Sequence, residues 1–109
     1  MTEPQVLRPY NALEAITTAE ACRIAGKALR TIVEWCQRYY IGRKIKGPWA
    51  VSRIALAMLL DGVEDSLALY LSGDRQSDAV VTYYRQLGVP LPRRSVIGTK
   101  PALNVEAVR

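Results

Sequence analysis

The chain has 109 residues, of which 50% are apolar and 23% are charged, so it can form one globular domain but not two ordinary ones. It contains no histidine, which excludes an imidazole base, a histidine-ligated metal and a Ser-His-Asp triad. Its two cysteines, Cys22 and Cys36, are too few for a disulfide framework, and its longest apolar run, Ile54–Leu60, is far shorter than the roughly 20 residues that cross a bilayer. These features predict a cytoplasmic protein that needs no metal or other cofactor and does not span a membrane.

The net charge of +5 is distributed unevenly along the chain. Residues 23–53 contain eight basic residues and one acidic residue, Glu34, and therefore carry +7, which exceeds the charge of the whole chain. Residues 1–22 and 54–92 carry −2 and −3, and residues 93–109 carry +3. The middle third is thus the candidate surface for a polyanionic partner, and a solvated run of charges is the alternative.

Residues 1–14 are interpreted as an N-terminal arm, and a helix follows it. Thr17 can cap this helix by accepting from the backbone N–H of Glu20, whose carboxylate can reach back and close a capping box. Gly26 offers the left-handed conformation that ends such a helix. A second helix is predicted beyond this turn, because apolar residues recur there at three- and four-residue spacing: Leu29, Ile32, Cys36 and Tyr39.

A short two-stranded hairpin is predicted next. Residues 43–46 alternate polar and apolar side chains, which is typical of a strand. Gly47-Pro48 then form a turn, and residues 49–51 are expected to form the second strand. Ser52 can cap a third helix over residues 53–61. This helix is so apolar that other parts of the protein are expected to cover it on two sides. Three hairpin residues are expected to face the core: Ile45, Trp49 and Val51.

The sequence thus predicts a mainly α fold over residues 15–61. Its order of elements, two helices joined by a tight turn, a basic hairpin and a third helix that covers them, is that of a winged helix-turn-helix with a two-stranded wing. In this architecture the second helix enters the major groove of DNA, and the hairpin meets the adjacent backbone or minor groove. Residues 62–87 are expected to form additional C-terminal helices, whose apolar surface favours self-association or contact with a partner protein. Residues 88–109 are predicted to form a mobile basic tail.

Several segments of the predicted DNA-binding region occur in an order and at a spacing that resemble those of a known protein family: Ile16–Ala21, Gly26, Arg30–Ile32, Trp35 and Gly47–Arg53. Together they resemble the excisionase family of recombination directionality factors, which have MerR-like winged helices. The sequence departs from the usual family pattern in three respects. Ala28 stands where a Ser or Thr caps the second helix, Val33–Glu34 stand where a basic pair is frequent, and Lys27 stands where an apolar residue is usual.

The resemblance places a recognition helix and a wing on this sequence. The candidate DNA-binding residues are Lys27, Arg30, Thr31, Val33, Glu34 and Arg38 in the recognition helix, and Arg43, Lys44, Lys46 and Gly47 in the wing. Arg30 can form two hydrogen bonds with guanine and Val33 can contact a thymine methyl group, whereas the wing cations suit phosphates. Ordinary solvated surface residues are the alternative interpretation. Residues Ile32, Trp35 and Trp49 are expected in the core.

The resemblance implies a non-catalytic, nucleoid-associated accessory protein of site-specific recombination in a mobile genetic element. Such an excisionase binds repeated sites on double-stranded DNA cooperatively, bends the DNA and directs an integrase, here expected to be a tyrosine recombinase, toward excision. The expected partners are therefore DNA, the integrase and further copies of the chain, with no small-molecule substrate. Two alternatives stay open: a small winged-helix transcriptional regulator, and a protein-interaction module such as a phage packaging subunit.

Overall fold

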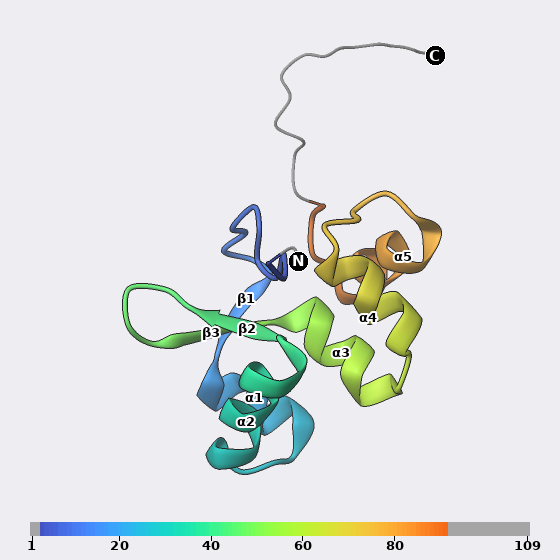
Figure 1. The fold of residues 1–109 in the computed structure, drawn as a ribbon. Coiled ribbons are helices and arrows are strands. Elements are labelled where there is room, and N and C mark those ends of the chain that lie inside the picture. The colour runs from blue at the N-terminus through green and yellow to red at the C-terminus, as the bar shows by residue number, and fades with distance from the viewer. Residues whose placement is uncertain (1–2, 92–109) are drawn as a thin grey trace, which may run out of the picture.

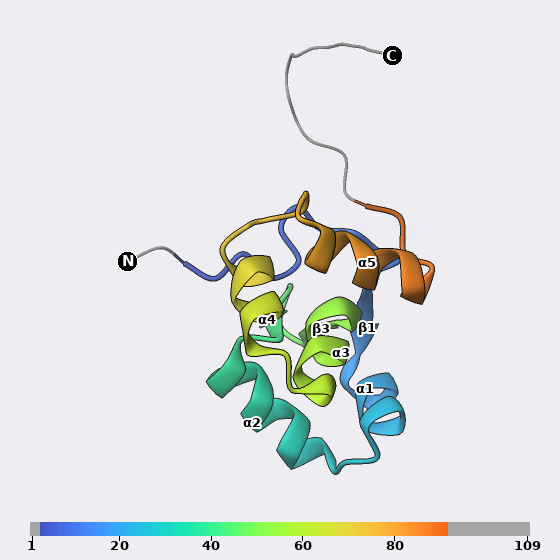
Figure 2. The same ribbon diagram turned by 90° about the vertical axis from the view of Figure 1, so that its right-hand side faces the viewer.

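The computed structural model describes residues 3–91 as a mainly helical fold with a small antiparallel sheet. Within these residues the elements are β1 (Ala15–Thr17), α1 (Thr18–Ala25), α2 (Leu29–Tyr39), β2 (Gly42–Lys44), β3 (Trp49–Ser52), α3 (Arg53–Asp61), α4 (Glu64–Leu71) and α5 (Asp78–Leu87). Helix α3 lies in the middle, with α1 and α2 on one side and α4 and α5 on the other (Figure 1, Figure 2). This arrangement is compatible with the predicted winged helix-turn-helix. No helix in the described part is long and apolar enough to cross a membrane.

Helix α1 begins and ends where the sequence predicts. The Oγ1 of Thr17 accepts a hydrogen bond from the backbone N–H of Glu20 at 3.1 Å, and Gly26 ends the helix with a φ of 67°. The Glu20 carboxylate, however, pairs with the guanidinium of Arg23 one turn further along. The prediction of a reciprocal capping box is therefore wrong in its second half. At the start of α2, Ala28 adopts the extended backbone of a helix cap and provides no side-chain hydrogen bond, as predicted.

The three strands form one sheet in the order β1-β3-β2. Ile16 of β1 and Gly42 of β2 both lie opposite Val51, so β3 is the central strand and the predicted β2–β3 hairpin is confirmed. Glycine fits at position 42 because a Cβ there would lie 2.5 Å from the carbonyl oxygen of Ala50 and 2.9 Å from the Sγ of Cys36. Strand β1 is not predicted from the sequence, because three residues are too few to show an alternating pattern.

One hydrophobic core contains side chains from every helix of the described part. Its buried helical members include Ala21, Ile32, Cys36, Ile54, Leu56, Met58, Leu67, Tyr70, Val80 and Tyr84. Helix α3 is covered from both sides, as its composition predicts, and α4 and α5 share its core instead of lying on an outer surface. Burial raises the pKa of the Cys36 thiol to about 11, so this thiol stays protonated and packs as an apolar group.

The N-terminal arm packs against the rest of the fold. Val6 and Leu7 are buried in the core. The guanidinium of Arg75 stacks on the ring of Tyr70, 3.9 Å from the ring centre, and donates a hydrogen bond to the carbonyl oxygen of Gln5 at 2.8 Å. The arm is thus held both by apolar burial and by hydrogen bonds to its backbone.

The first residues of the predicted tail are also packed. Val89 is buried and its backbone N–H donates to the carbonyl oxygen of Tyr84 at 3.0 Å. The Asn11 side chain donates to the carbonyl oxygen of Pro90 at 2.9 Å, which connects this segment to the N-terminal arm. Residues 92–109, which contain the rest of the predicted basic tail, lie outside the described residues.

A buried carboxylate joins the arm, the sheet and the two last helices. Glu14 is 1% exposed and accepts hydrogen bonds from the Oγ of Ser52 at 2.6 Å, from the hydroxyl of Tyr84 at 2.7 Å and from the hydroxyl of Tyr70. The Tyr70 hydroxyl in turn accepts from the backbone N–H of Leu7 at 3.0 Å. Burial, together with the charge of Glu14, raises the pKa of Tyr70 and of Tyr84 well above the usual range. Both phenols are therefore protonated donors at neutral pH.

Candidate nucleic-acid interface

Helix α2 has one face in the core and the opposite face in solvent. Ile32 and Cys36 are buried, whereas Arg30, Glu34 and Arg38 follow one another at four-residue spacing and are exposed. The other candidate residues of this segment lie around that exposed stripe, with Lys27 exposed in the preceding turn and Thr31 and Val33 half-buried. The structure therefore collects the six predicted recognition-helix residues on the solvent side of α2 and its entry turn.

The β2–β3 hairpin projects from the body of the molecule (Figure 1). Its turn places Lys46 and Gly47 in left-handed conformations, with φ values of 54° and 110°, and both residues are exposed. The ammonium group of Lys44 lies 5.5 Å from the centre of the Trp49 ring, so the ring supports this exposed cation. Two lysines are thus presented at the end of the hairpin.

Arg43 differs from the other predicted wing residues. Its side chain turns toward the N-terminal arm, where Nε donates to the carbonyl oxygen of Val6 at 3.2 Å and Nη2 donates to that of Leu7 at 3.0 Å. Two of its donors are therefore used within the protein, and the residue is half-buried. This geometry makes Arg43 a structural link between strand β2 and the arm, a role that the sequence does not indicate.

A hollow of about 560 Å³ separates the N-terminal half of α2 from the hairpin. Leu29 and Val33 line it from α2, while Ile45 and Trp49 line it from the hairpin and its strand. We call this concavity the helix-hairpin hollow. It shows that the solvent side of α2 and the cationic hairpin border the same concave surface.

Two residues of this hollow were not expected at the surface or at a site. The apolar pattern predicts Leu29 in the core, but its side chain is 56% exposed. Side chains in a helix point toward its N-terminus. Because Leu29 is the first residue of α2, its side chain extends beyond the start of the helix, where the elements that bury Ile32 do not cover it. Tyr10, also 56% exposed, lines the same hollow from the arm. The sequence carries no signal for Tyr10, because it precedes every periodic segment.

Within the described residues, the cations of α2, its entry turn and the hairpin have no carboxylate partner. Within residues 3–91 the ion pairs join Arg8 to Glu3 and Arg23 to Glu20. Five exposed cations on α2, its entry turn and the hairpin are therefore available to an external anion: Lys27, Arg30, Arg38, Lys44 and Lys46. Glu34 is the exposed acidic residue among them on α2.

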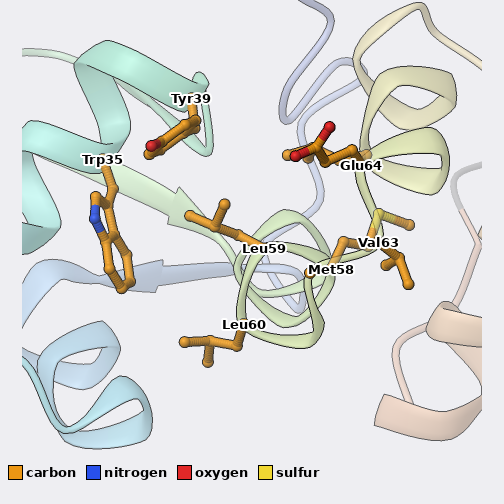
Figure 3. A pocket seen from close by; sticks show the side chains of 9 residues that line it. Trp35, Tyr39, Met58, Leu59, Leu60, Val63 and Glu64 are labelled. Carbon is orange, nitrogen blue, oxygen red and sulfur yellow. The ribbon is translucent and has the colours of Figure 1, made fainter.

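A second hollow, of about 640 Å³, lies on the other side of α2 and has a different character. Figure 3 shows Trp35 and Tyr39 of α2 facing Leu59 of α3 across it. The remaining lining residues come from α3, α4 and the turn between them, and the charged residue among them is Glu64. A hollow with apolar walls and one carboxylate does not suit a polyanion.

Comparison of the chain with protein-family models, with curated proteins and with solved structures finds no match. In the described part of the chain, no group of three or more Cys, Asp or Glu side chains is placed to hold a metal ion. The function is therefore inferred from the geometry and charge of the chain itself.

Proposed function

We propose that this chain binds double-stranded DNA as a non-catalytic winged helix-turn-helix protein, with α2 as its recognition helix and the β2–β3 hairpin as its wing. The observation that carries the proposal is the placement of five cations without carboxylate partners on the two elements that border one hollow. Phosphate neutralisation by lysine and arginine supplies most of the affinity in such complexes. A single surface with this charge therefore suits the DNA backbone.

The dimensions of α2 support its insertion into the major groove. The helix has 11 residues, which corresponds to about 16 Å, and the major groove admits one α-helix with its side chains. Arg30 lies in the first turn of α2, the part of a recognition helix that contacts base edges. Lys27 in the entry turn and Arg38 near the end of the helix are then placed toward the flanking phosphates. The hairpin lysines contact the neighbouring backbone.

The resemblance of residues 15–61 to excisionases supports a more specific role for the DNA complex. In this role several copies occupy repeated sites, the array bends the DNA, and an integrase of the tyrosine recombinase class is directed toward excision. Leu60 and Leu69, which are 42% and 38% exposed on α3 and α4, are apolar surface outside the cationic face that supports contact between copies. Excision of a cognate element that requires both this chain and the integrase would test the role directly.

Two single variants separate base readout from phosphate contact. Arg30→Ala is expected to weaken binding to a specific site by about 1–3 kcal/mol and to relax the base preference at one position. Lys46→Ala is expected to weaken binding to all duplexes equally and to lower the slope of log affinity against log salt by about 1. The measurement is fluorescence anisotropy on a duplex selected from a random pool and on a scrambled duplex of the same length.

The matched control for this pair is Arg85→Ala, which removes an exposed cation from α5 at the end of the molecule opposite the hairpin (Figure 1). It should leave both affinities unchanged. Equal losses on selected and scrambled DNA for Arg30→Ala would show that another residue reads the bases. Wild-type protein that binds no duplex would support the protein-interaction alternative instead.

A further inference from the structure

The helix-hairpin hollow is lined by apolar, aromatic and hydroxyl side chains, although α2 and the hairpin, which border it, carry exposed cations. Among its lining side chains, Tyr10, Leu29 and Pro48 are exposed and Val33 is half-buried. Single exposed apolar residues are common on protein surfaces, but here they gather in one concavity beside Ile45 and Trp49. A gathered apolar surface of this kind indicates a contact with an apolar group of a ligand.

The charge around the hollow restricts the chemical class of that ligand. No charged residue lines the hollow itself, and the exposed cations next in the chain to its lining residues include Arg30, which follows Leu29, and Lys46, which follows Ile45. The occupant must therefore bring an apolar group together with dense negative charge. Duplex DNA meets both conditions, because the C5-methyl group of thymine is the apolar feature that base edges present in the major groove.

We propose that Leu29 and Val33, with Tyr10 at the edge of the hollow, recognise thymine methyl groups, so that the protein selects A·T pairs next to the base contacted by Arg30. This inference rests on the proposed function and names the sequence class that the site prefers. Leu29 and Val33 are four residues apart on α2, so their side chains are neighbours about 5–6 Å apart. That separation lets them contact methyl groups on adjacent base pairs.

Replacing thymine by deoxyuridine tests the inference, because it removes only the methyl group. A binding site is first selected from a random duplex pool with the intact protein, and each thymine in it is then replaced singly. Loss of one buried methyl contact is expected to lower affinity about fourfold at one or two positions next to a G·C pair, and to have no effect elsewhere. Fluorescence anisotropy at constant salt gives the affinities.

Protein variants then assign the contact to its residues. Leu29→Ala should lose the discrimination between thymine and deoxyuridine at the position that Leu29 contacts, and Val33→Ala should lose it at the neighbouring position. Leu91→Ala is the matched control, since Leu91 is an exposed leucine that does not line the helix-hairpin hollow and should retain the full discrimination. The discrimination shown by wild-type protein does not depend on whether any variant folds.

The outcomes distinguish this inference from the proposed function. Absence of DNA binding by wild-type protein overturns both. Specific binding that tolerates deoxyuridine at every position overturns the thymine inference alone and leaves the DNA-binding proposal in place. Discrimination that survives in Leu29→Ala at full strength overturns the assignment to this hollow.

Discussion

Replacement of Glu14 by alanine is expected to lower the free energy of unfolding by about 3–5 kcal/mol. The carboxylate accepts hydrogen bonds from Ser52, Tyr70 and Tyr84, and the rings of both tyrosines are buried. Removing the acceptor leaves the buried Tyr84 hydroxyl without a partner, which costs about 1–3 kcal/mol. The hydroxyls of Tyr70 and Ser52 still lie within 3.0 Å of each other but lose their charged acceptor, which adds to the cost. Urea unfolding followed by circular dichroism measures the loss.

Two further variants refine the result for Glu14. Glu14→Gln keeps one acceptor oxygen but turns an NH₂ group toward hydroxyl donors, so its loss should lie between those of wild type and Glu14→Ala. Tyr84→Phe removes one donor while preserving the apolar ring, and it should cost about 1.5–3 kcal/mol, the range for a hydrogen bond to a charged group. A loss below about 1 kcal/mol for Glu14→Ala would show that the buried network contributes little to stability.

Reversing the charge of both hairpin lysines in the double variant Lys44→Glu/Lys46→Glu is expected to lower the affinity for every duplex by about 100-fold or more. The double change removes two phosphate contacts and places two carboxylates against the DNA backbone. Both side chains are exposed at the end of a projecting hairpin, so thermal unfolding should change little. Fluorescence anisotropy on selected and scrambled duplexes gives the affinities.

Neutral and distant variants serve as controls for the hairpin reversal. Lys44→Gln/Lys46→Gln should give an intermediate loss, because it removes the attraction without adding repulsion. Arg85→Glu makes a charge reversal on α5, away from the hairpin, and should retain nearly full affinity. An equal loss in Arg85→Glu would mean that only the overall charge matters and that the hairpin has no special role.

The elements that the sequence predicts correctly are those with local signals. Thr17, Gly26 and Ser52 mark helix ends through their own backbone or hydroxyl chemistry, and the glycine-proline turn marks the hairpin. These signals act over a few residues, so no tertiary information is needed to interpret them. The order of the helices and strands from residue 15 to 61 follows from them.

The features that the sequence does not predict depend on contacts between distant segments. Glu14 lies 38 residues from Ser52 and 70 from Tyr84, and nothing near it in the chain indicates burial. Arg43 similarly contributes to packing through the carbonyl oxygens of Val6 and Leu7, although its basic neighbours suggest a surface role. Leu29 follows the apolar period yet stays exposed, because it begins its helix.

These corrections change which residues make up the candidate interface. Arg43 belongs chiefly to the packing of the arm, whereas Tyr10 and Leu29 join the concave surface. Helices α4 and α5 complete the core around α3 and hold Glu14 through Tyr70 and Tyr84. The predicted extension is thus needed for the stability of the fold, whatever contacts its outer surface makes.

The salt dependence of DNA affinity tests the central claim most directly. If Arg30 contacts a base and the other four cations of the interface contact phosphates, log affinity should fall against log salt with a slope of about −3.6, which is about a 150-fold loss between 50 and 200 mM salt. Intact protein and a 20-base-pair duplex in an anisotropy titration are sufficient. A slope near zero, or no binding at 50 mM salt, would contradict DNA recognition by α2 and the hairpin.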